Sequence, residues 1–180
     1  RLALNKSPKT VRNAHGLLVS VLNVYAPDMR IKTTLPKMQK KIKRLPEVKD
    51  IIKAIKGSDV EIPCLLAMWC SLRMSEVRGA KKSNINGNIL TIEDTIVTVG
   101  GEHIERNATK TVESTRQVRL PDVILKLINA LPPEQEYLTK YTQSQIYKRF
   151  EALLDKHDIQ HISFHDLRHL DASVMAMLNI

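Results

Sequence analysis

Apolar residues recur every three or four positions near the start of the chain, which is the spacing of an amphipathic helix. This spacing extends over residues 9–26 and ends at Pro27. A second helix is predicted to begin at Leu45-Pro46-Glu47, where a proline and a glutamate suit a first turn, and to stop at Gly57. The first part of the chain is therefore predicted to be helical.

The next segment is predicted to be a buried helix. Ser58 and Glu61 have the spacing of a capping box, with a hydroxyl at the cap and a carboxylate three residues later. From Ile62 to about Leu72 the sequence is apolar nearly all round, which is typical of a helix at the centre of its domain. A short helix is predicted to start near Ser75.

The period of the pattern changes to two from Ile85 onward. Residues 89–92, 96–99 and 116–120 form alternating, β-branched runs, and Gly87 and Gly100-Gly101 interrupt them. This pattern predicts a small antiparallel sheet of about three strands.

Helical spacing returns after the strands. Pro121 is predicted to open a helix that ends near Leu131. Thr142 and Gln145 form a capping box for a helix that runs to about His157, and Ser163 with Asp166 forms another for the last helix. The sequence thus predicts a mixed α+β fold that is mostly helical, with helices around the small sheet.

The length of 180 residues suits one full domain and part of another. We expect a helical domain end at 1–30, a basic linker at 31–45, and a main domain at 46–180. The net charge is +9 and the isoelectric point is about 9.6, which favours a nucleic-acid partner over an acidic small molecule. The linker supplies part of this charge through Lys37, Lys40, Lys41, Lys43 and Arg44.

Several function classes are disfavoured. No stretch approaches 18 uncharged apolar residues, so we expect no membrane partner, and no glycine-rich nucleotide fingerprint is present. Four histidines recur every four positions, at His157, His161, His165 and His169, which would suit a metal site on one helix. The predicted cap at Ser163 divides them between segments, so we expect neither a metal nor a cofactor.

Three segments contain residues suited to phosphate chemistry. His165 and Arg168 lie three apart at the start of the last helix, so one face offers a proton-transfer group and a fixed cation. Arg73 ends the buried helix, and Glu76 is its nearest acidic partner. This pair is either a structural ion pair or an arginine held for an external anion. Lys110, in a predicted hairpin turn, would by itself be a solvated lysine.

Taken in order, these segments resemble the tyrosine recombinases, or phage-type integrases. The three matching segments are Leu72-Arg73-Met74-Ser75-Glu76, Thr109-Lys110-Thr111 and His165-Asp166-Leu167-Arg168-His169. The resemblance implies a phosphate clamp made by Arg73 and Arg168, a leaving-group acid in Lys110, and an assisting His165. It implies supporting roles for Glu76 and His169, and it makes residues 9–26 the end of a core-binding domain.

The resemblance also implies a partner and a reaction. The partner is double-stranded DNA, bound by the linker cations and by Lys81 and Lys82, and the active form is a homo-tetramer on DNA. The reaction is site-specific cleavage and rejoining through a 3′-phosphotyrosine, in the cytoplasm of a bacterial cell, by a protein that a prophage or mobile element encodes. No cofactor is implied.

The nucleophilic tyrosine of that family follows the His-x-x-Arg segment, whereas all four tyrosines of this chain precede it. We therefore expect the catalytic domain to be truncated before its nucleophile and this chain to be inactive by itself. Two alternatives stay open: a catalytically inactive DNA-binding remnant or regulator, and a protein-interaction domain whose basic face is only solvated. Sequence after the His-x-x-Arg segment discriminates the first from the enzyme, and a salt titration of DNA binding discriminates the second.

Overall fold

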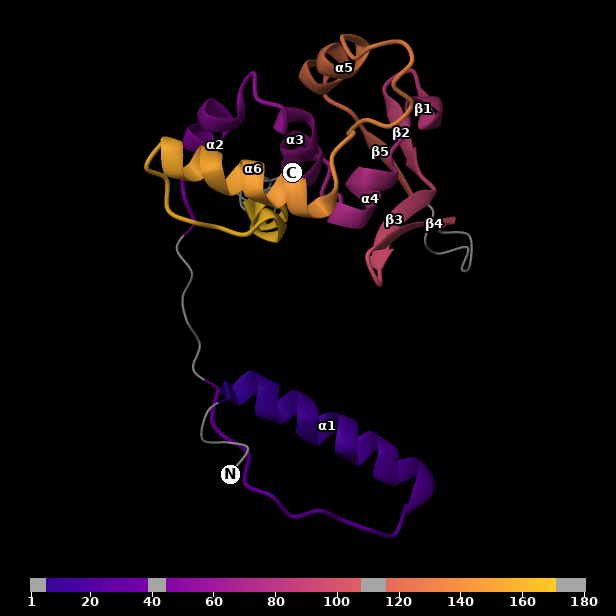
Figure 1. Cartoon of the computed structure of the whole chain (residues 1–180), viewed down its shortest axis with the longest axis vertical. Coiled ribbons are helices and arrows are strands. Elements are labelled where there is room, and N and C mark those ends of the chain that lie inside the picture. The colour runs from indigo at the N-terminus through magenta and orange to yellow at the C-terminus, as the bar shows by residue number, and fades with distance from the viewer. Residues whose placement is uncertain (1–5, 39–44, 108–115, 171–180) are drawn as a thin grey trace. The chain divides into compact units, whose positions relative to one another are not determined.

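The structure, a computed structural model, describes residues 6–38, 45–107 and 116–170. The chain divides into two compact units, Arg1–Arg44 and Leu45–Ile180 (Figure 1). The division falls at the end of the basic segment 31–45. Each unit is described by itself below.

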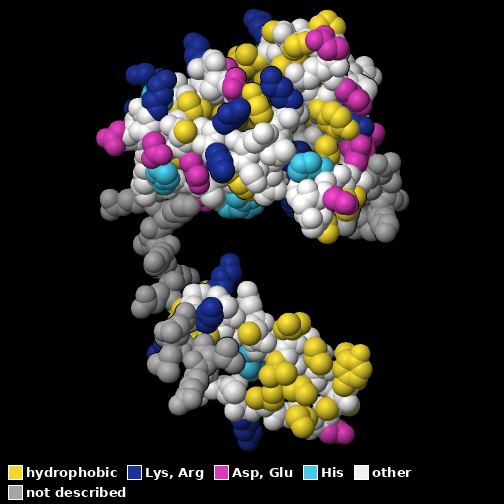
Figure 2. Space-filling view, in the orientation of Figure 1, with side chains coloured by type: hydrophobic (Ala, Val, Ile, Leu, Met, Phe, Trp, Pro, Cys, Tyr) yellow, Lys and Arg dark blue, Asp and Glu magenta, His cyan; other side chains and the backbone are white. Residues whose placement is uncertain are grey.

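The first unit is built on helix α1, Pro8–Tyr25. The helix begins where predicted because Ser7 caps it, its hydroxyl accepting a hydrogen bond from the Thr10 amide at 3.2 Å. None of its residues is buried. Exposed apolar side chains such as Leu17 and Val24 gather over this helix in Figure 2. The pattern therefore predicted the helix correctly, although its apolar face lies open within this unit.

Part of the expected linker lies along α1. The Arg12 Nε donates to the Pro36 carbonyl at 3.0 Å, and the Thr33 hydroxyl is hydrogen-bonded to the His15 ring at 2.7 Å. These contacts attach residues 33–36 to the first unit.

Helix α3, Glu61–Trp69, lies at the centre of the second unit. It packs against α4 (Met74–Gly79), α5 (Asp122–Asn129) and the 3-10 turn η4 (Phe164–Asp166). Every residue from Pro63 to Met68 is buried. The prediction of a helix buried nearly all round is confirmed. The helix ends at Trp69 rather than near Leu72, however, so Arg73 caps α4 instead of ending the buried helix.

The capping box predicted at the start of this helix is wrong. Val60 occupies the cap position, and the Glu61 carboxylate accepts the Gly57 amide at 2.7 Å. The Ser58 hydroxyl is buried and lacks a hydrogen-bond partner in the described part of the chain. A capping box would have had Glu61 accept the amide of Ser58. Glu61 accepts the amide of Gly57 instead, in a left-handed turn where Gly57 has a φ of +72°.

Two further helices complete the helical layer. Helix α2, Val48–Ile55, packs against α6, Gln143–Lys156 (Figure 1). The predicted capping box at the start of α6 forms, with Thr142 and Gln145 each bonding the other's backbone amide. Leu45 and Pro46 precede α2 rather than forming its first turn, because Glu47 is its cap.

The strands form two separate antiparallel sheets. The first has the order β1-β2-β5, and its strands are Ile85–Asn86, Ile89–Ile92 and Arg116–Arg119. A 3-10 turn η1, Lys82–Asn84, leads into β1. The second sheet is a hairpin of β3, Asp94–Val99, and β4, Glu102–Asn107.

The sequence therefore predicted a three-stranded sheet but assigned one strand to it wrongly. Residues 96–99 pair with β4 and not with the sheet, whose third strand is the short β1. Strand β4 contains Glu102, Glu105 and Arg106, so it lacks the apolar alternation that identifies a half-buried strand. Gly100 and Gly101, both with positive φ, make the turn between the two strands.

The hairpin packs on α4 at a point where the two backbones nearly touch. A Cβ atom added to Gly79 would lie 2.4 Å from the Asp94 carbonyl oxygen and 2.9 Å from the Thr95 Cα. Only glycine fits this contact, because the obstructing atoms belong to the backbone of β3.

We predict that Gly79→Ala destabilises the second unit by about 1–3 kcal/mol, the usual cost of forcing atoms into a packed interface. Denaturant unfolding measures the change. Gly16→Ala is the control, because Gly16 lies in α1 with open space around it and should be neutral or slightly stabilising. A Gly79→Ala protein as stable as the wild type would contradict the close backbone contact.

Candidate functional site

A buried carboxylate organises the turn between α3 and α4. Glu76 is only 6% exposed, although it belongs to a helix that begins at the surface. Its Oε2 accepts the Arg73 backbone amide at 2.8 Å, and its Oε1 accepts the Arg73 guanidinium at 3.0 Å. One carboxylate thus caps the helix and fixes the direction of an arginine whose side chain is 62% exposed.

A second arginine reaches the same carboxylate from the sheet. Arg116, at the start of β5, donates from its NH1 to Oε1 of Glu76 at 3.0 Å and from its NH2 to Oε2 at 2.8 Å. Its NH2 also lies 3.4 Å from the carbonyl oxygen of Ser71. Arg116 was not among the site residues predicted from the sequence. The strand alternation could have identified it. Arg116 lies on the same, half-buried face of the strand as Val118, and an arginine on such a face needs an acidic partner.

These hydrogen bonds decide the ionisation of Glu76. Burial by itself raises the pKa of a carboxyl group, and the hydrogen bonds from Arg116 and from Arg73 outweigh that effect. The pKa of Glu76 therefore lies below its ordinary value of 4.5. The side chain is a carboxylate at neutral pH, and both of its oxygens are occupied.

The predicted cap of the last segment forms as the sequence indicates. The Asp166 carboxylate accepts the Ser163 amide at 2.6 Å, and residues 167–170 are helical after the turn η4. Phe164 anchors this turn, packing edge-on against the Phe150 ring of α6 at 6.2 Å between ring centres. The turn is thereby held against α3 and α6.

The same turn leads into Arg168, whose pKa responds to the charged groups around Glu76. Burial lowers the pKa of Arg168, the positive charges of Arg73 and Arg116 lower it further, and the negative charge of Glu76 raises it. These electrostatic effects link Arg168 to the three groups that are joined by hydrogen bonds. We call Arg73, Glu76, Arg116 and Arg168 the arginine cluster.

The two histidines of the last segment lie beside one another on the surface. His165 is in the turn η4, His169 is in the helical residues after it, and both are exposed. Their rings meet edge to face with centres 5.3 Å apart. The other two histidines of the four-residue spacing lie elsewhere: His157 caps the end of α6, and His161 is paired with Asp155 at 2.6 Å. Within the described residues no group of three or more metal-ligand side chains occurs.

Two of the lysines predicted to bind DNA make contacts within the domain. The Lys81 ammonium lies 2.6 Å from the Glu105 carboxylate and 3.6 Å from both Asp94 and Glu136. Lys82 donates to the carbonyls of Leu131 and Pro132, at 3.3 and 2.6 Å. Through these contacts both lysines join neighbouring segments of the domain.

One of the remaining predicted cations lies in the described part of the chain. Lys37 is exposed in the first unit. Lys40, Lys41, Lys43, Arg44 and the predicted leaving-group acid Lys110 lie outside the described residues.

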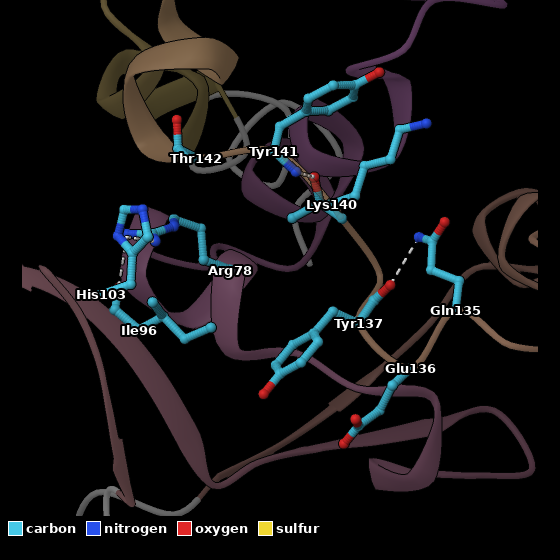
Figure 3. A pocket seen from close by; sticks show the side chains of 10 residues that line it. Arg78, Ile96, His103, Gln135, Glu136, Tyr137, Lys140, Tyr141 and Thr142 are labelled. Atoms are coloured by element: carbon cyan, nitrogen blue, oxygen red, sulfur yellow. Dashed lines mark hydrogen bonds between the residues drawn. The ribbon is translucent and has the colours of Figure 1, made fainter.

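A separate pocket of about 270 Å³ lies between α4, the β3–β4 hairpin and the 135–142 segment (Figure 3). Arg78 forms one wall, where it is 5% exposed. It donates to the Ile96 carbonyl, the Thr98 hydroxyl and the His103 ring at 3.0–3.2 Å. No member of the arginine cluster lines this pocket. Through these hydrogen bonds Arg78 joins α4 to the hairpin.

Comparisons with known proteins agree at the level of fold. No protein-family model matches the chain, and a search of curated proteins gives no match. Among solved structures, the chain is similar to the integrase of transposon Tn1549 in complex with transposon right-end DNA. That match has a TM-score of 0.76 at 14% identity and covers 98% of this chain and 69% of that one.

Two further solved structures give the same result. The XerA recombinase matches with a TM-score of 0.56 at 20% identity, over 99% of this chain and 66% of that one. A lambda integrase dimer bound to a core site matches with a TM-score of 0.52 at 15% identity. The match covers 78% of this chain and 53% of that one. The fold is that of the phage-type integrase catalytic domain, mixed α+β and mostly helical. In the described ranges no helix is both long and apolar enough to cross a membrane.

We predict that Glu76 stabilises the second unit in a pH-dependent way. Since its folded pKa is lowered, its contribution is fully present above its unfolded pKa and is lost as the pH falls through its folded pKa. Glu76→Gln should therefore be less stable than the wild type at pH 7, and the difference should shrink below about pH 4.5. Urea unfolding between pH 7 and pH 3 measures it. A difference independent of pH would mean that Glu76 is not held as a carboxylate.

Proposed function

We propose that this chain is the catalytic part of a phage-type tyrosine recombinase, which cleaves and rejoins DNA at specific sites through a 3′-phosphotyrosine intermediate. The observation that carries the proposal is the arginine cluster. Arg73 is hydrogen-bonded to the buried Glu76 carboxylate, and the charges of both act on Arg168, which is distant in sequence, in a domain with the integrase fold. The sequence segments that contain these two arginines resemble those of the family and occur in the same order.

The cluster suits phosphoryl transfer. Negative charge grows on the non-bridging oxygens of a phosphodiester as it is attacked, and fixed cations stabilise that charge. The guanidinium of Arg73 is partly exposed while Glu76 fixes its direction, so it can meet a phosphate without reorganising. Burial and the neighbouring positive charges of Arg73 and Arg116 lower the pKa of Arg168, and a bound dianionic transition state would relieve the repulsion among these cations.

The other residues take the roles that the resemblance implies. His165, exposed beside His169, would assist proton transfer or hydrogen-bond a non-bridging oxygen, and His169 would support it. Lys110 would protonate the departing 5′-oxygen. Glu76 would keep the first arginine oriented.

The nucleophile in this proposal is a tyrosine supplied from outside the present sequence. In the second unit, Tyr137 donates to Glu105, Tyr141 lies against Arg149, and Tyr147 packs on Phe164. All of these tyrosines precede the His-x-x-Arg segment. The competing hypothesis, an inactive DNA-binding remnant or regulator, requires that no such tyrosine be supplied.

The proposed partner is double-stranded DNA, which Lys37 and the neighbouring cations of the linker would contact through its phosphates. The Tn1549 integrase was solved with transposon-end DNA, which supports this choice. We further propose a homo-tetramer on DNA, in a bacterial cell and encoded by a prophage or mobile element.

We predict that Arg73→Ala and Arg168→Ala each lower the DNA cleavage rate of the full-length protein by about 10²–10³ and change DNA affinity much less. The clamp acts on charge that appears only in the transition state. Arg→Lys at either position should restore little, because an ammonium cannot reproduce the planar guanidinium fork. Single-turnover cleavage and binding titrations separate the two effects, and Arg119→Ala, on the exposed side of β5, controls for charge. Equal losses of rate and affinity would favour the binding remnant.

We predict that the 180-residue chain binds DNA with an affinity that falls steeply with salt, yet forms no covalent adduct. Nicked suicide substrates followed by denaturing gels detect the adduct. A covalent band would show that one of the tyrosines in this chain is the nucleophile. Affinity that does not change with salt would instead favour the interaction-domain hypothesis.

A further inference from the structure

We propose that Arg116 is a positioning residue of the recombinase site, which neutralises Glu76 so that Glu76 can orient Arg73 without cancelling its charge. The inference rests on the proposed function and adds a residue to its machinery. Three observations carry it: the hydrogen bonds of Glu76, the attachment of Arg116 to the sheet, and the charge balance of the arginine cluster.

The hydrogen bonds are shared equally between the two arginines. Glu76 accepts two hydrogen bonds from Arg73, one from its amide and one from its guanidinium, and two from the Arg116 guanidinium. Each carboxylate oxygen has one partner from each arginine. Without Arg116 a buried carboxylate would keep only half of its donors, and its orientation would no longer be fixed on both sides.

Arg116 is itself held on a rigid element. Its backbone lies opposite Ile92 in the ladder of β2 and β5, and Ile92 is 5% exposed. Its third contact is the carbonyl of Ser71, a residue with a φ of +50° in the turn between α3 and α4. The left-handed turn directs this carbonyl to Arg116. The side chain therefore ties the sheet to the turn that presents Arg73, as a preorganised site requires.

The charge balance explains why a second arginine is useful here. Arg73 and Glu76 alone form a neutral pair, and a neutral pair attracts a phosphate weakly. Arg116 compensates the carboxylate, so that Arg73 and Arg168 together keep a charge of +2 for the substrate (three cations and one carboxylate). Burial is the main cause that lowers the pKa of Arg168, and the charges of Arg73 and Arg116 lower it further.

The contacts also make Arg116 a positioning residue rather than a phosphate ligand. Its NH1 and NH2 groups are both directed at Glu76, and NH2 is shared with Ser71. Its side chain is 37% exposed, compared with 62% for Arg73. Arg73 is thus the member of the pair that is open to a ligand.

The test compares Arg116→Gln with Arg119→Gln in the full-length protein. Both residues lie in β5 and lose the same charge, but the strand alternation puts Arg119 on the opposite, exposed face. We expect Arg116→Gln to lower the single-turnover cleavage rate by about 10–100-fold, as loss of a supporting group typically does. DNA affinity should fall equally and slightly in both variants. Arg116→Lys should restore part of the rate, because it returns the charge without the fork.

The pH profile gives a readout that a merely structural residue would not move. Removing Arg116 removes a cause that lowers the pKa of Glu76 and leaves burial, which raises it. The acid limb of the cleavage rate should therefore shift to higher pH in Arg116→Gln and not in Arg119→Gln. Glu76→Gln combined with Arg116→Gln should be no slower than Glu76→Gln alone, because the two residues act as one unit.

A second measurement uses the 180-residue chain and needs no cleavage. NMR titration of the labelled Glu76 carboxyl should give a higher pKa in Arg116→Gln and Arg116→Lys than in Arg119→Gln. An unchanged Glu76 titration, or equal cleavage by the Arg116 and Arg119 variants, would overturn the inference. A wild-type protein that does not cleave, with the Glu76 titration behaving as expected, would overturn the proposed function and leave the positioning contact intact.

Discussion

The site depends on one interaction, the carboxylate of Glu76 held between the guanidinium groups of Arg73 and Arg116. A buried charge is costly unless every acceptor position is filled, and here four hydrogen bonds fill them. Because two of these bonds come from the turn before α4 and two from β5, the carboxylate can be satisfied only when the helix layer and the sheet are in place together. The stability of the domain and the geometry of the candidate clamp therefore have the same origin.

The rest of the second unit holds these segments in position. Helix α3 is buried on all sides, so the turn at Ser71 starts from a fixed point. Phe164 packs against the rings of Tyr147 and Phe150 in α6 and so fixes the start of the segment that contains Arg168. Gly79 lets β3 approach α4 without a side chain between them. Each of these contacts is apolar or backbone-made, which leaves the charged groups to converge on one region.

The positive charge of the chain has two different uses. Lys81 and Arg78 join the β3–β4 hairpin to the domain, Lys81 through three carboxylates and Arg78 through a carbonyl, a hydroxyl and an imidazole ring. These cations contribute to the net charge of +9, although their charged groups are turned to the protein itself. Overall charge therefore supports the proposed nucleic-acid partner but does not identify the surface that would contact it. Contacts inside the fold decide which basic side chains remain available.

The sequence by itself determined what depends on neighbouring residues. The caps at Thr142 and Ser163, the buried helix and the pairing of Arg73 with Glu76 all involve positions three or four apart, where helix geometry fixes the contact. Only the tertiary structure decided the partnership of Glu76 with Arg116, the separation of the hairpin from the sheet, and the internal use of Lys81 and Lys82. These depend on which segments pack together. That outcome follows from burial over the whole domain, because a carboxylate or an ammonium accepts whichever partner the packed backbone brings within reach.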